Sequence, residues 1–174
     1  MSDPEQPIQI LVLAADFFEE SELIYPVLRA REEGYAVTVG GVGTAPVRGK
    51  SGYGPYPVDA DVAELSADDF NAIVVPGGFA PDLLRRSAPV LELVRKFDAA
   101  GKPVAFVCHG AWVGISAGIV SGRRLTSVGA IRDDLRNAGA DWVDEPVVVD
   151  GNLITAQLPR DLGTWMRALI DTLS

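Results

Sequence analysis

Residues 103–111 read PVAFVCHGA, a short apolar run followed at once by a cysteine, a histidine, a glycine and an alanine. A short run that is apolar throughout is typical of a strand buried inside a parallel sheet. The residues behind it form a helical pattern over 109–120, which Ser121 and Gly122 bring to an end. The stretch therefore predicts a strand, a tight turn and a helix, with Cys108 on the turn.

The same alternation of apolar runs and helical patterns extends along the rest of the chain. Further strands are expected over 8–14, 35–42, 72–75, 147–149 and 153–156, and further helices over 20–33, 89–100, 132–138 and 159–173. Residues 43–69 carry turn signals and predict no more than a short edge hairpin with a solvated acidic face. The pattern predicts an α/β fold, a three-layer sandwich with a mostly parallel sheet, helices on both faces and a small antiparallel accessory near the C-terminus.

Length and composition narrow the class of protein further. The 174 residues suit one domain over 1–174, and a hydrophobic content of 48% excludes a disordered chain. The formal net charge of −9 opposes binding to nucleic acid or to an anionic membrane, so neither is expected as a partner. The start, MSDPEQP, has no signal-peptide pattern, and the single cysteine cannot form an intrachain disulfide, which together predict a cytoplasmic protein.

In such sheets, binding sites form at the carboxyl ends of strands. Here three strand ends are candidates, residues 15–20, 76–81 and 108–110. The first turn reads AADFFEE, whose carboxylates would repel a pyrophosphate, so a dinucleotide site is not expected. The chain has one cysteine and one histidine, adjacent to each other, too few soft ligands for a metal centre. We therefore expect no cofactor and no metal.

Cys108 is the strongest catalytic candidate because it stands on a strand-to-helix turn like the nucleophile elbow of hydrolases. A helix N-terminus favours the thiolate, so the pKa of this thiol is expected below the ~8.5 of free cysteine. The alternative is a buried, inert cysteine. The neighbouring His109 either stabilises the thiolate and moves protons, or makes only a local hydrogen bond at the helix start.

The other two strand ends supply candidate partners for the thiol. Glu19 lies nearest the first strand end, where a carboxyl group beside Cys108 would have a raised pKa and could donate a hydrogen bond to the thiolate. For Glu20 we favour an ordinary role at the helix N-terminus. Gly77 and Gly78 offer backbone N–H groups for an oxyanion hole, or form a simple turn.

Six stretches, in order along the chain, carry a resemblance to a known family. They are residues 19–26 (EESELIYP), 75–81 (VPGGFAP), 101–105 (GKPVA), 108–110 (CHG), 131–134 (IRDD) and 138–144 (AGADWVD). This ordered set resembles the PfpI-like intracellular protease family of the ThiJ/PfpI superfamily. The resemblance implies a flavodoxin-like sandwich with Cys108 as nucleophile and a protonated Glu19 hydrogen-bonded to its sulfur. It also implies that Gly77 or Gly78, with the backbone N–H of His109, binds the oxyanion.

The resemblance also implies a homodimer or higher homo-oligomer. In members described as proteases, a glutamate of a neighbouring subunit orients the histidine beside the nucleophile. This chain has Asp82 there, one methylene shorter, and has Val128 where relatives often carry a tyrosine. We expect Asp82 to act weakly across a subunit interface, or else to cap a helix.

Two classes of function follow. The first is a stress-protective enzyme in which Cys108 attacks carbonyl carbon in small electrophiles, glycated groups or peptides, matching the glyoxalase III, deglycase and peptidase activities named in the family. Small electrophiles are favoured over peptides because the residue that orients His109 is changed. The alternative is a non-enzymatic redox or stress sensor whose Cys108 is oxidised. A glutamine amidotransferase is excluded because it needs a second, later histidine.

Overall fold

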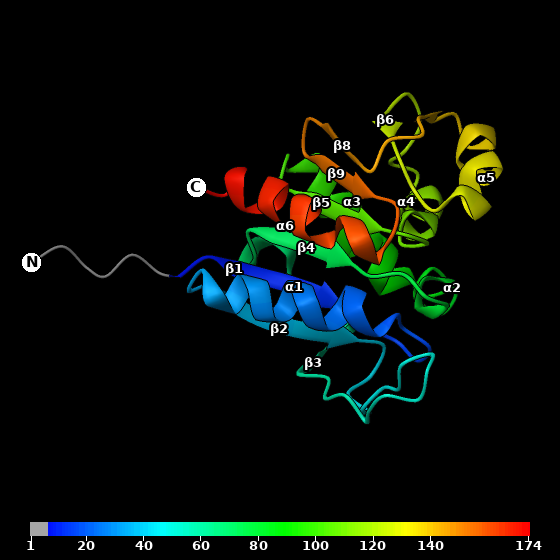
Figure 1. The fold of residues 1–174 in the computed structure, drawn as a ribbon. Helices are drawn as coiled ribbons and strands as arrows, with labels where there is room; N and C mark the ends of the chain where they lie inside the picture. Colours follow the sequence, from blue (N-terminus) through cyan, green and yellow to red (C-terminus); the bar gives the residue numbers. More distant parts are fainter. Residues whose placement is uncertain (1–6) are drawn as a thin grey trace, which may run out of the picture.

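A computed structural model describes residues 7–174, so all of the polar start except Pro7 lies outside the described residues. The main sheet has seven strands in the order β3-β2-β1-β4-β5-β9-β8 (Figure 1). Its strands are β1 (Gln9–Leu13), β2 (Ala36–Gly41), β3 (Ala60–Asp61), β4 (Ala72–Val75), β5 (Val104–Val107), β8 (Val147–Asp150) and β9 (Leu153–Ala156). All neighbouring pairs are parallel except β8 with β9.

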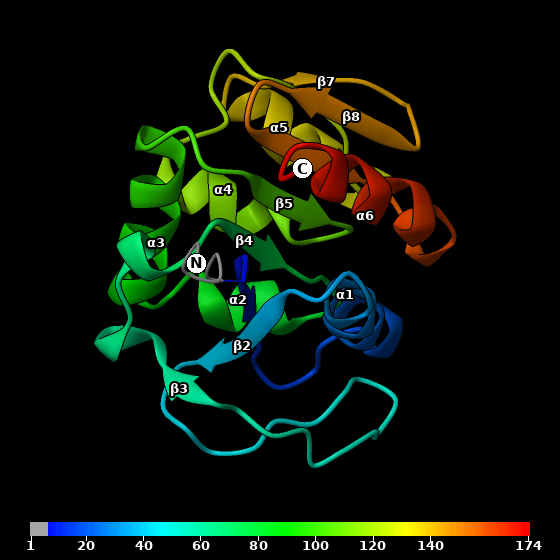
Figure 2. The same ribbon diagram turned by 90° about the vertical axis from the view of Figure 1, so that its left-hand side faces the viewer.

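Helices cover both faces of this sheet. They are α1 (Glu20–Glu32), α2 (Ala80–Leu84), α3 (Ala88–Ala99), α4 (Ala111–Ala117), α5 (Arg132–Asn137) and α6 (Leu162–Asp171). Figure 2 shows α1 and α6 on one side of the sheet and α3 and α4 on the other. The predicted three-layer α/β sandwich with a mostly parallel sheet is therefore confirmed.

Central strands β4 and β5 are buried at every position, which explains why their sequences are apolar without alternation. Helix α1 buries Leu23, Val27 and Ala30 against the sheet, as their helical spacing predicts. The hairpin expected around residues 150–152 is present, because β8 pairs antiparallel with β9.

Four details differ from the sequence predictions. The antiparallel strand belongs to the main sheet, and the separate accessory, β6 (Arg124–Leu125) with β7 (Asp141–Trp142), is parallel. Residues 43–69 contain a short antiparallel pairing of Val47 with Tyr56, as expected, and also supply the parallel edge strand β3, which was not expected. The short helix α2 begins at Ala80, so Asp82 lies in its first turn and does not cap it. The helix expected from residue 109 begins at Ala111 and ends where Gly118 adopts a φ of +77°, since Cys108 and His109 occupy the turn.

The strand order sets the position of the site. The chain runs from β1 to β2 on one side, then returns to place β4 on the other side of β1. Such a reversal leaves a crevice at the carboxyl ends of the strands. The segments after β1, β4 and β5 therefore meet at this edge, and they are the three predicted strand ends. Among residues 7–174, no helix has the length and apolar character needed to cross a membrane.

Candidate active site

Cys108 occupies a strained turn directly after β5. Its φ is +58°, a left-handed conformation that is costly for a residue with a side chain and is common at catalytic turns. The turn is fixed by hydrogen bonds from the Cys108 N–H to the Ala156 carbonyl (3.0 Å) and from the Gly110 N–H to the Val107 carbonyl (2.8 Å). At Gly110 a side chain would collide with the Val75 carbonyl. The sequence therefore folds as an elbow that presents the thiol at the crevice.

Gly77 shows how closely the three strand ends approach one another. A Cβ added there would lie 2.5 Å from Glu22 Oε2, 2.7 Å from Cys108 Cβ and 2.9 Å from the His109 nitrogen. Real Cβ atoms do not approach other atoms so closely, so only glycine fits between these groups. The backbone of Gly77 thus brings the Glu22 carboxyl group and the Cys108 turn together.

Glu22 is the carboxyl group beside the thiol. Its side chain is 0% exposed, and Oε2 accepts a 2.8 Å hydrogen bond from the Gly77 N–H. Its other oxygen, Oε1, is buried and finds no hydrogen-bond partner within residues 7–174. Burial raises the pKa of Glu22 to about 7, since the charged form loses its hydration. Glu22 can therefore hold or release a proton near neutral pH.

The thiol itself is a weak acid in this structure. Cys108 is 9% exposed, and burial, together with the charge of Glu22, raises its pKa to about 12. Backbone hydrogen bonds from His109 and Gly78 act in the opposite direction but do not overcome burial. The expectation of a thiol pKa below that of free cysteine is therefore wrong for the unliganded site, because desolvation outweighs the helix N-terminus.

Glu19 does not lie against the sulfur, so its predicted hydrogen bond to Cys108 is wrong. Its Oε2 pairs with Lys50 Nζ at 2.5 Å, and its Oε1 accepts a 3.0 Å hydrogen bond from the Ser21 hydroxyl. The reason is helical geometry. Glu19 precedes helix α1, whereas Glu22 lies within its first turn, where side chains lean back toward the helix N-terminus and the crevice.

The acidic turn after β1 holds the loop around residue 50 in place. Asp16 Oδ1 accepts from the Arg48 N–H (2.8 Å), and Glu20 Oε1 accepts from the Ser51 N–H (2.7 Å). Between them, the Lys50 N–H donates to the Phe18 carbonyl (2.9 Å). These bonds position the Lys50 ammonium group beside the site, where its charge acts on Cys108, Glu22 and His109.

The predicted oxyanion donors are only partly available. The Gly77 N–H is already bonded to Glu22, so its assignment as a free oxyanion donor is wrong. The backbone N–H groups of Gly78 and His109 instead converge on the Cys108 sulfur. Gly78 reaches this place with a φ of +72°, and a Cβ there would lie 2.5 Å from the Phe17 carbonyl oxygen.

His109 lies against the thiol on its other side. Its Nδ1 is 3.3 Å from Cys108 Sγ, and its ring packs at 5.1 Å from that of Trp112. Burial and the charge of Lys50 lower the pKa of His109, which keeps the ring neutral near pH 7. Asp82 pairs with Arg86 in the turn after helix α2, and no hydrogen bond or ion pair joins it to His109 in the part of this chain that the structure describes.

Sequence reasoning missed Glu22 and Lys50. A signal for Glu22 was present, since it shares the buried stripe of α1 with Leu23, Pro26 and Val27, and a carboxylate on such a stripe needs an explanation. Lys50 gave no local signal, because it lies in an irregular loop. Within residues 7–174 no cluster of three or more histidine, cysteine or carboxylate groups is placed to hold a metal ion.

A cysteine on the turn after a central parallel strand, beside a buried carboxyl group, places the chain among flavodoxin-like proteins with a cysteine at the crevice. Residues 8–172 match the DJ-1/PfpI family. The chain belongs to that family, and the resemblance found in its motifs is confirmed.

Relatives and solved structures agree with this placement. The deglycase PfpI of Pyrococcus furiosus is 45% identical over 166 residues, covering 95% of this chain and 99% of the relative. Protein/nucleic acid deglycase 2 of Escherichia coli is 38% identical over 161 residues, covering 91% and 94% respectively. The crystal structure of Drosophila melanogaster DJ-1beta superimposes with a TM-score of 0.90 at 30% identity, covering 97% of this chain and 91% of that one.

Proposed function

We propose that this protein is a cysteine-dependent enzyme that removes small carbonyl compounds, acting on free α-oxoaldehydes and on the adducts they form with amines. The observation that carries the proposal is the buried Glu22 carboxyl group beside the Cys108 thiol, with a pKa raised to about 7. A weakly acidic thiol with an adjacent base of near-neutral pKa is the arrangement that activates a nucleophile at neutral pH. The deglycase names of its relatives support the same chemistry.

The first step is addition of sulfur to the aldehyde carbon. Glu22 takes the thiol proton as the S–C bond forms, and that proton then neutralises the resulting oxyanion. In a glycated amine, sulfur displaces the amine from the same carbon, and the proton on Glu22 goes to the leaving nitrogen. Both routes give the same hemithioacetal on Cys108. The N–H groups of Gly78 and His109, which converge on the sulfur, are placed to stabilise charge near it.

The remaining steps need only proton transfer and water. Glu22 moves the proton from the former aldehyde carbon to the adjacent carbonyl carbon, and the hydroxyl proton passes from the first oxygen to the second. Together these transfers convert the hemithioacetal into a thioester of a hydroxy acid. Hydrolysis of the thioester releases a hydroxy acid and restores the thiol. For methylglyoxal the sum is one water added and lactate formed, so the reaction consumes no cofactor.

The structure favours this function over the redox sensor. Oxidation of a cysteine depends on thiolate character and exposure. Cys108 is 9% exposed with a raised pKa, which opposes direct attack on peroxide. Peptide hydrolysis would require a neighbouring subunit of a homo-oligomer to bring Asp82 to His109, since in one chain Asp82 pairs with Arg86.

The test is turnover by purified protein on two substrates. Lactate formation from methylglyoxal and release of free amine from methylglyoxal-treated N-acetyl-lysine are compared in wild type, Cys108→Ser and Glu22→Gln. We expect wild type to act on both substrates and both variants to fail. If wild type converted neither substrate, and its mass increased by two oxygen atoms in dilute peroxide, the redox-sensor function would replace the enzymatic one.

A further inference from the structure

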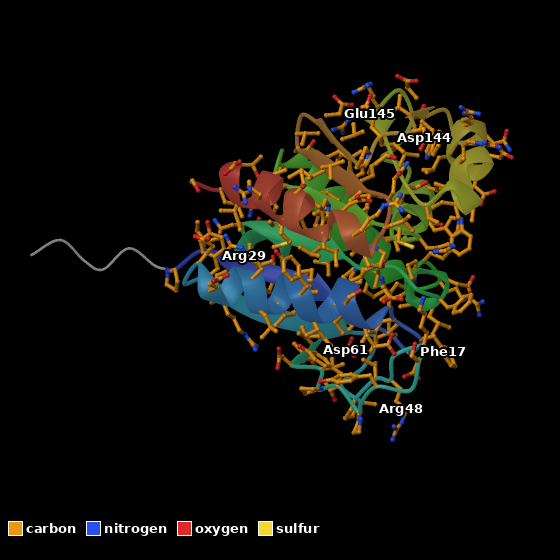
Figure 3. All side chains as sticks on the ribbon, in the orientation of Figure 1. Phe17, Arg29, Arg48, Asp61, Asp144 and Glu145 are labelled. Carbon is orange, nitrogen blue, oxygen red and sulfur yellow. The ribbon has the colours of Figure 1, made fainter. Side chains whose placement is uncertain are left out.

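Two large aromatic side chains stand in solvent at the rim of the crevice. Phe17 is 56% exposed and Phe79 is 62% exposed. They follow different strands, β1 and β4, but the Phe79 N–H donates a 2.8 Å hydrogen bond to the Phe17 carbonyl. Figure 3 places Phe17 at the carboxyl edge of the sheet, near Arg48. The two exposed phenylalanines are therefore joined through their backbones at this edge.

The pair is directly connected to the reactive centre. Phe79 lies two residues after Gly77, whose backbone contacts the Cys108 turn, and Gly78 between them packs against the Phe17 carbonyl. The Gly78 N–H also faces the Cys108 sulfur. The backbones of the two phenylalanines are thus linked through Gly78 to the position of the thiol.

The backbone of Phe17 is strained. Within residues 7–174, only Phe17, with a φ of +64°, and the nucleophile Cys108 adopt a positive φ without being glycine. The Phe17 N–H donates to the Arg48 carbonyl at 2.6 Å, and the Phe17 carbonyl accepts from the Phe79 N–H, so the peptide groups on both sides of Phe17 are held. Glycine would adopt this conformation without strain. Phenylalanine here strains the backbone and also exposes an apolar ring to water, and both effects lower the stability of the fold. A residue that lowers stability in this way indicates a role in binding or activity.

We propose that Phe17 and Phe79 determine specificity by binding an apolar or aromatic side chain that flanks the reactive carbonyl group of a peptide. This inference rests on the proposed function and names the part of the substrate that lies beyond the reacting carbon. Contacts between aromatic rings add stabilisation beyond that of area burial alone. Cys108 would therefore react faster with a carbonyl or glycated group carried beside an apolar residue than with the free small molecule.

The experiment measures the thiol without relying on turnover. Chloroacetamide and N-benzylchloroacetamide alkylate cysteine by the same step, in which sulfur displaces chloride, and they differ only in the benzyl group. Rates of single addition to Cys108 are followed by intact mass in wild type, Phe17→Gly, Phe79→Ala and the control Leu28→Ala. Leu28, on α1, is as exposed as Phe17, at 59%, but projects from the later turns of that helix.

We expect wild type and Leu28→Ala to prefer the benzyl reagent equally. Phe17→Gly should lower this preference by about threefold to tenfold, the factor expected for loss of one aromatic contact, while its melting temperature is not lowered. An unchanged preference in both phenylalanine variants would overturn the inference. A change of oligomeric mass in Phe17→Gly would also overturn it, by assigning the pair to contact between subunits. Failure of methylglyoxal turnover would refute the proposed function alone, because alkylation does not depend on it.

Discussion

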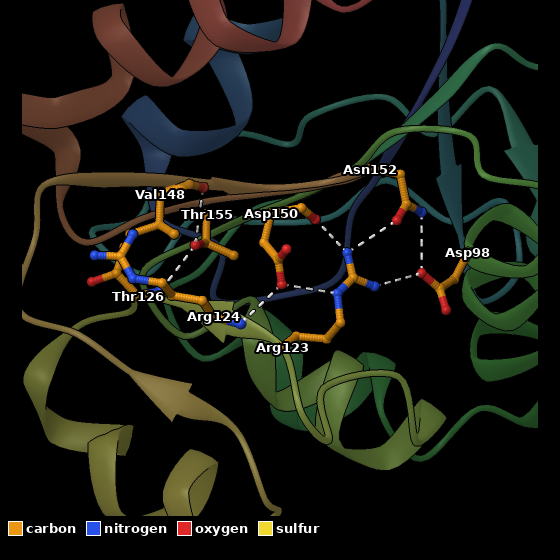
Figure 4. A network of polar contacts seen from close by, with 8 residues as sticks. All are labelled: Asp98, Arg123, Arg124, Thr126, Val148, Asp150, Asn152 and Thr155. Atoms are coloured by element: carbon orange, nitrogen blue, oxygen red, sulfur yellow. Dashed lines mark hydrogen bonds and ion pairs between the residues drawn. The ribbon is translucent and has the colours of Figure 1, made fainter.

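Two clusters of polar groups lie at opposite edges of the sheet, and only one of them holds a cation between its acidic groups. Near the amino ends of β5 and β9, the Arg123 guanidinium group lies between Asp98 (3.2 Å) and Asp150 (3.1 Å) (Figure 4). Arg123 also donates to Asn152 Oδ1 at 3.1 Å, and Asn152 donates in turn to Asp98. This Arg123 cluster links helix α3, the β8–β9 hairpin and the loop before β6.

The cluster at the carboxyl edge consists of two acids, Glu22 and Cys108, and no buried cation from residues 7–174 lies between them. One Glu22 oxygen is unpartnered, and the nearest ammonium group, that of Lys50, is held by Glu19. Paired charges join elements of the fold, whereas buried acids without a cation between them keep perturbed pKa values and remain reactive. The comparison predicts that substitutions at the Arg123 cluster change stability and those at the Cys108 cluster change activity.

The largest effect is expected from Cys108→Ala. Removing the nucleophile should lower turnover of methylglyoxal by at least about 10³-fold, while the free energy of unfolding changes by about 1 kcal/mol or less. Lactate formation and urea unfolding measure the two quantities. Full activity of this variant on methylglyoxal, or on a fluorogenic peptide, would remove the nucleophile assignment for that substrate.

Glu22→Gln should lower turnover by ~10²–10⁴-fold, because glutamine cannot take the thiol proton. The same change should stabilise the fold at alkaline pH. The folded pKa of Glu22, about 7, lies above its ordinary value of 4.5, so wild-type stability falls as pH rises from 4.5 to 7 and is then constant.

The glutamine variant lacks this fall, which amounts to about 3 kcal/mol for such a shift. Urea unfolding of both proteins at pH 5 and pH 8 tests the sign. If the free energy of unfolding differed between variant and wild type by the same amount at pH 5 and at pH 8, Glu22 would be ionised in the folded protein at both pH values.

Arg123→Met should lower the free energy of unfolding by about 2 kcal/mol, because Asp98 and Asp150 lose their shared cation. Turnover per folded molecule should not change. Arg124→Met is the matched control, since Arg124 pairs with Glu145 on the surface and should contribute less than about 1 kcal/mol. A loss of turnover in Arg123→Met at full folding would contradict the division between the two clusters.

The pH dependence of kcat/KM should show one ascending limb. Activity requires Glu22 in its basic form, so the rate should rise about tenfold between pH 6 and pH 8, with a midpoint near 7. This midpoint belongs to the Glu22–Cys108 pair, which shares one proton in the active form. Stopped assays of lactate formation measure it. A midpoint near 4.5 would assign the titration to an exposed carboxyl group.

The smallest effect is expected from Glu19→Gln. It removes an ion pair with Lys50 at the crevice rim, and such pairs contribute about 0.2–1 kcal/mol, so turnover should fall by no more than about fivefold. The comparison with Glu22→Gln in one assay is decisive. Equal losses in the two variants would return the acid–base role to Glu19.

The sequence predicted the architecture well because apolar runs and helical periods report burial directly. It also predicted that Cys108 stands on an elbow, since a strand followed by small residues leaves few other arrangements. It did not identify which of the glutamates at residues 19–22 faces the thiol, because that depends on where α1 begins to within one residue. The docking of Lys50 depends on an irregular loop held by backbone hydrogen bonds, which residue types alone do not specify.

The close approach of Gly77 to Glu22 and Cys108 limits how this site can be altered. Because any side chain there would collide with both groups, the floor of the crevice cannot be remodelled by substitution without dismantling the reactive pair. Changes in substrate preference are therefore easier to introduce at the rim, where the side chains of Phe17 and Phe79 are exposed. Laboratory evolution of this protein should therefore keep the residues around Gly77 unchanged and vary the exposed residues at the rim of the crevice.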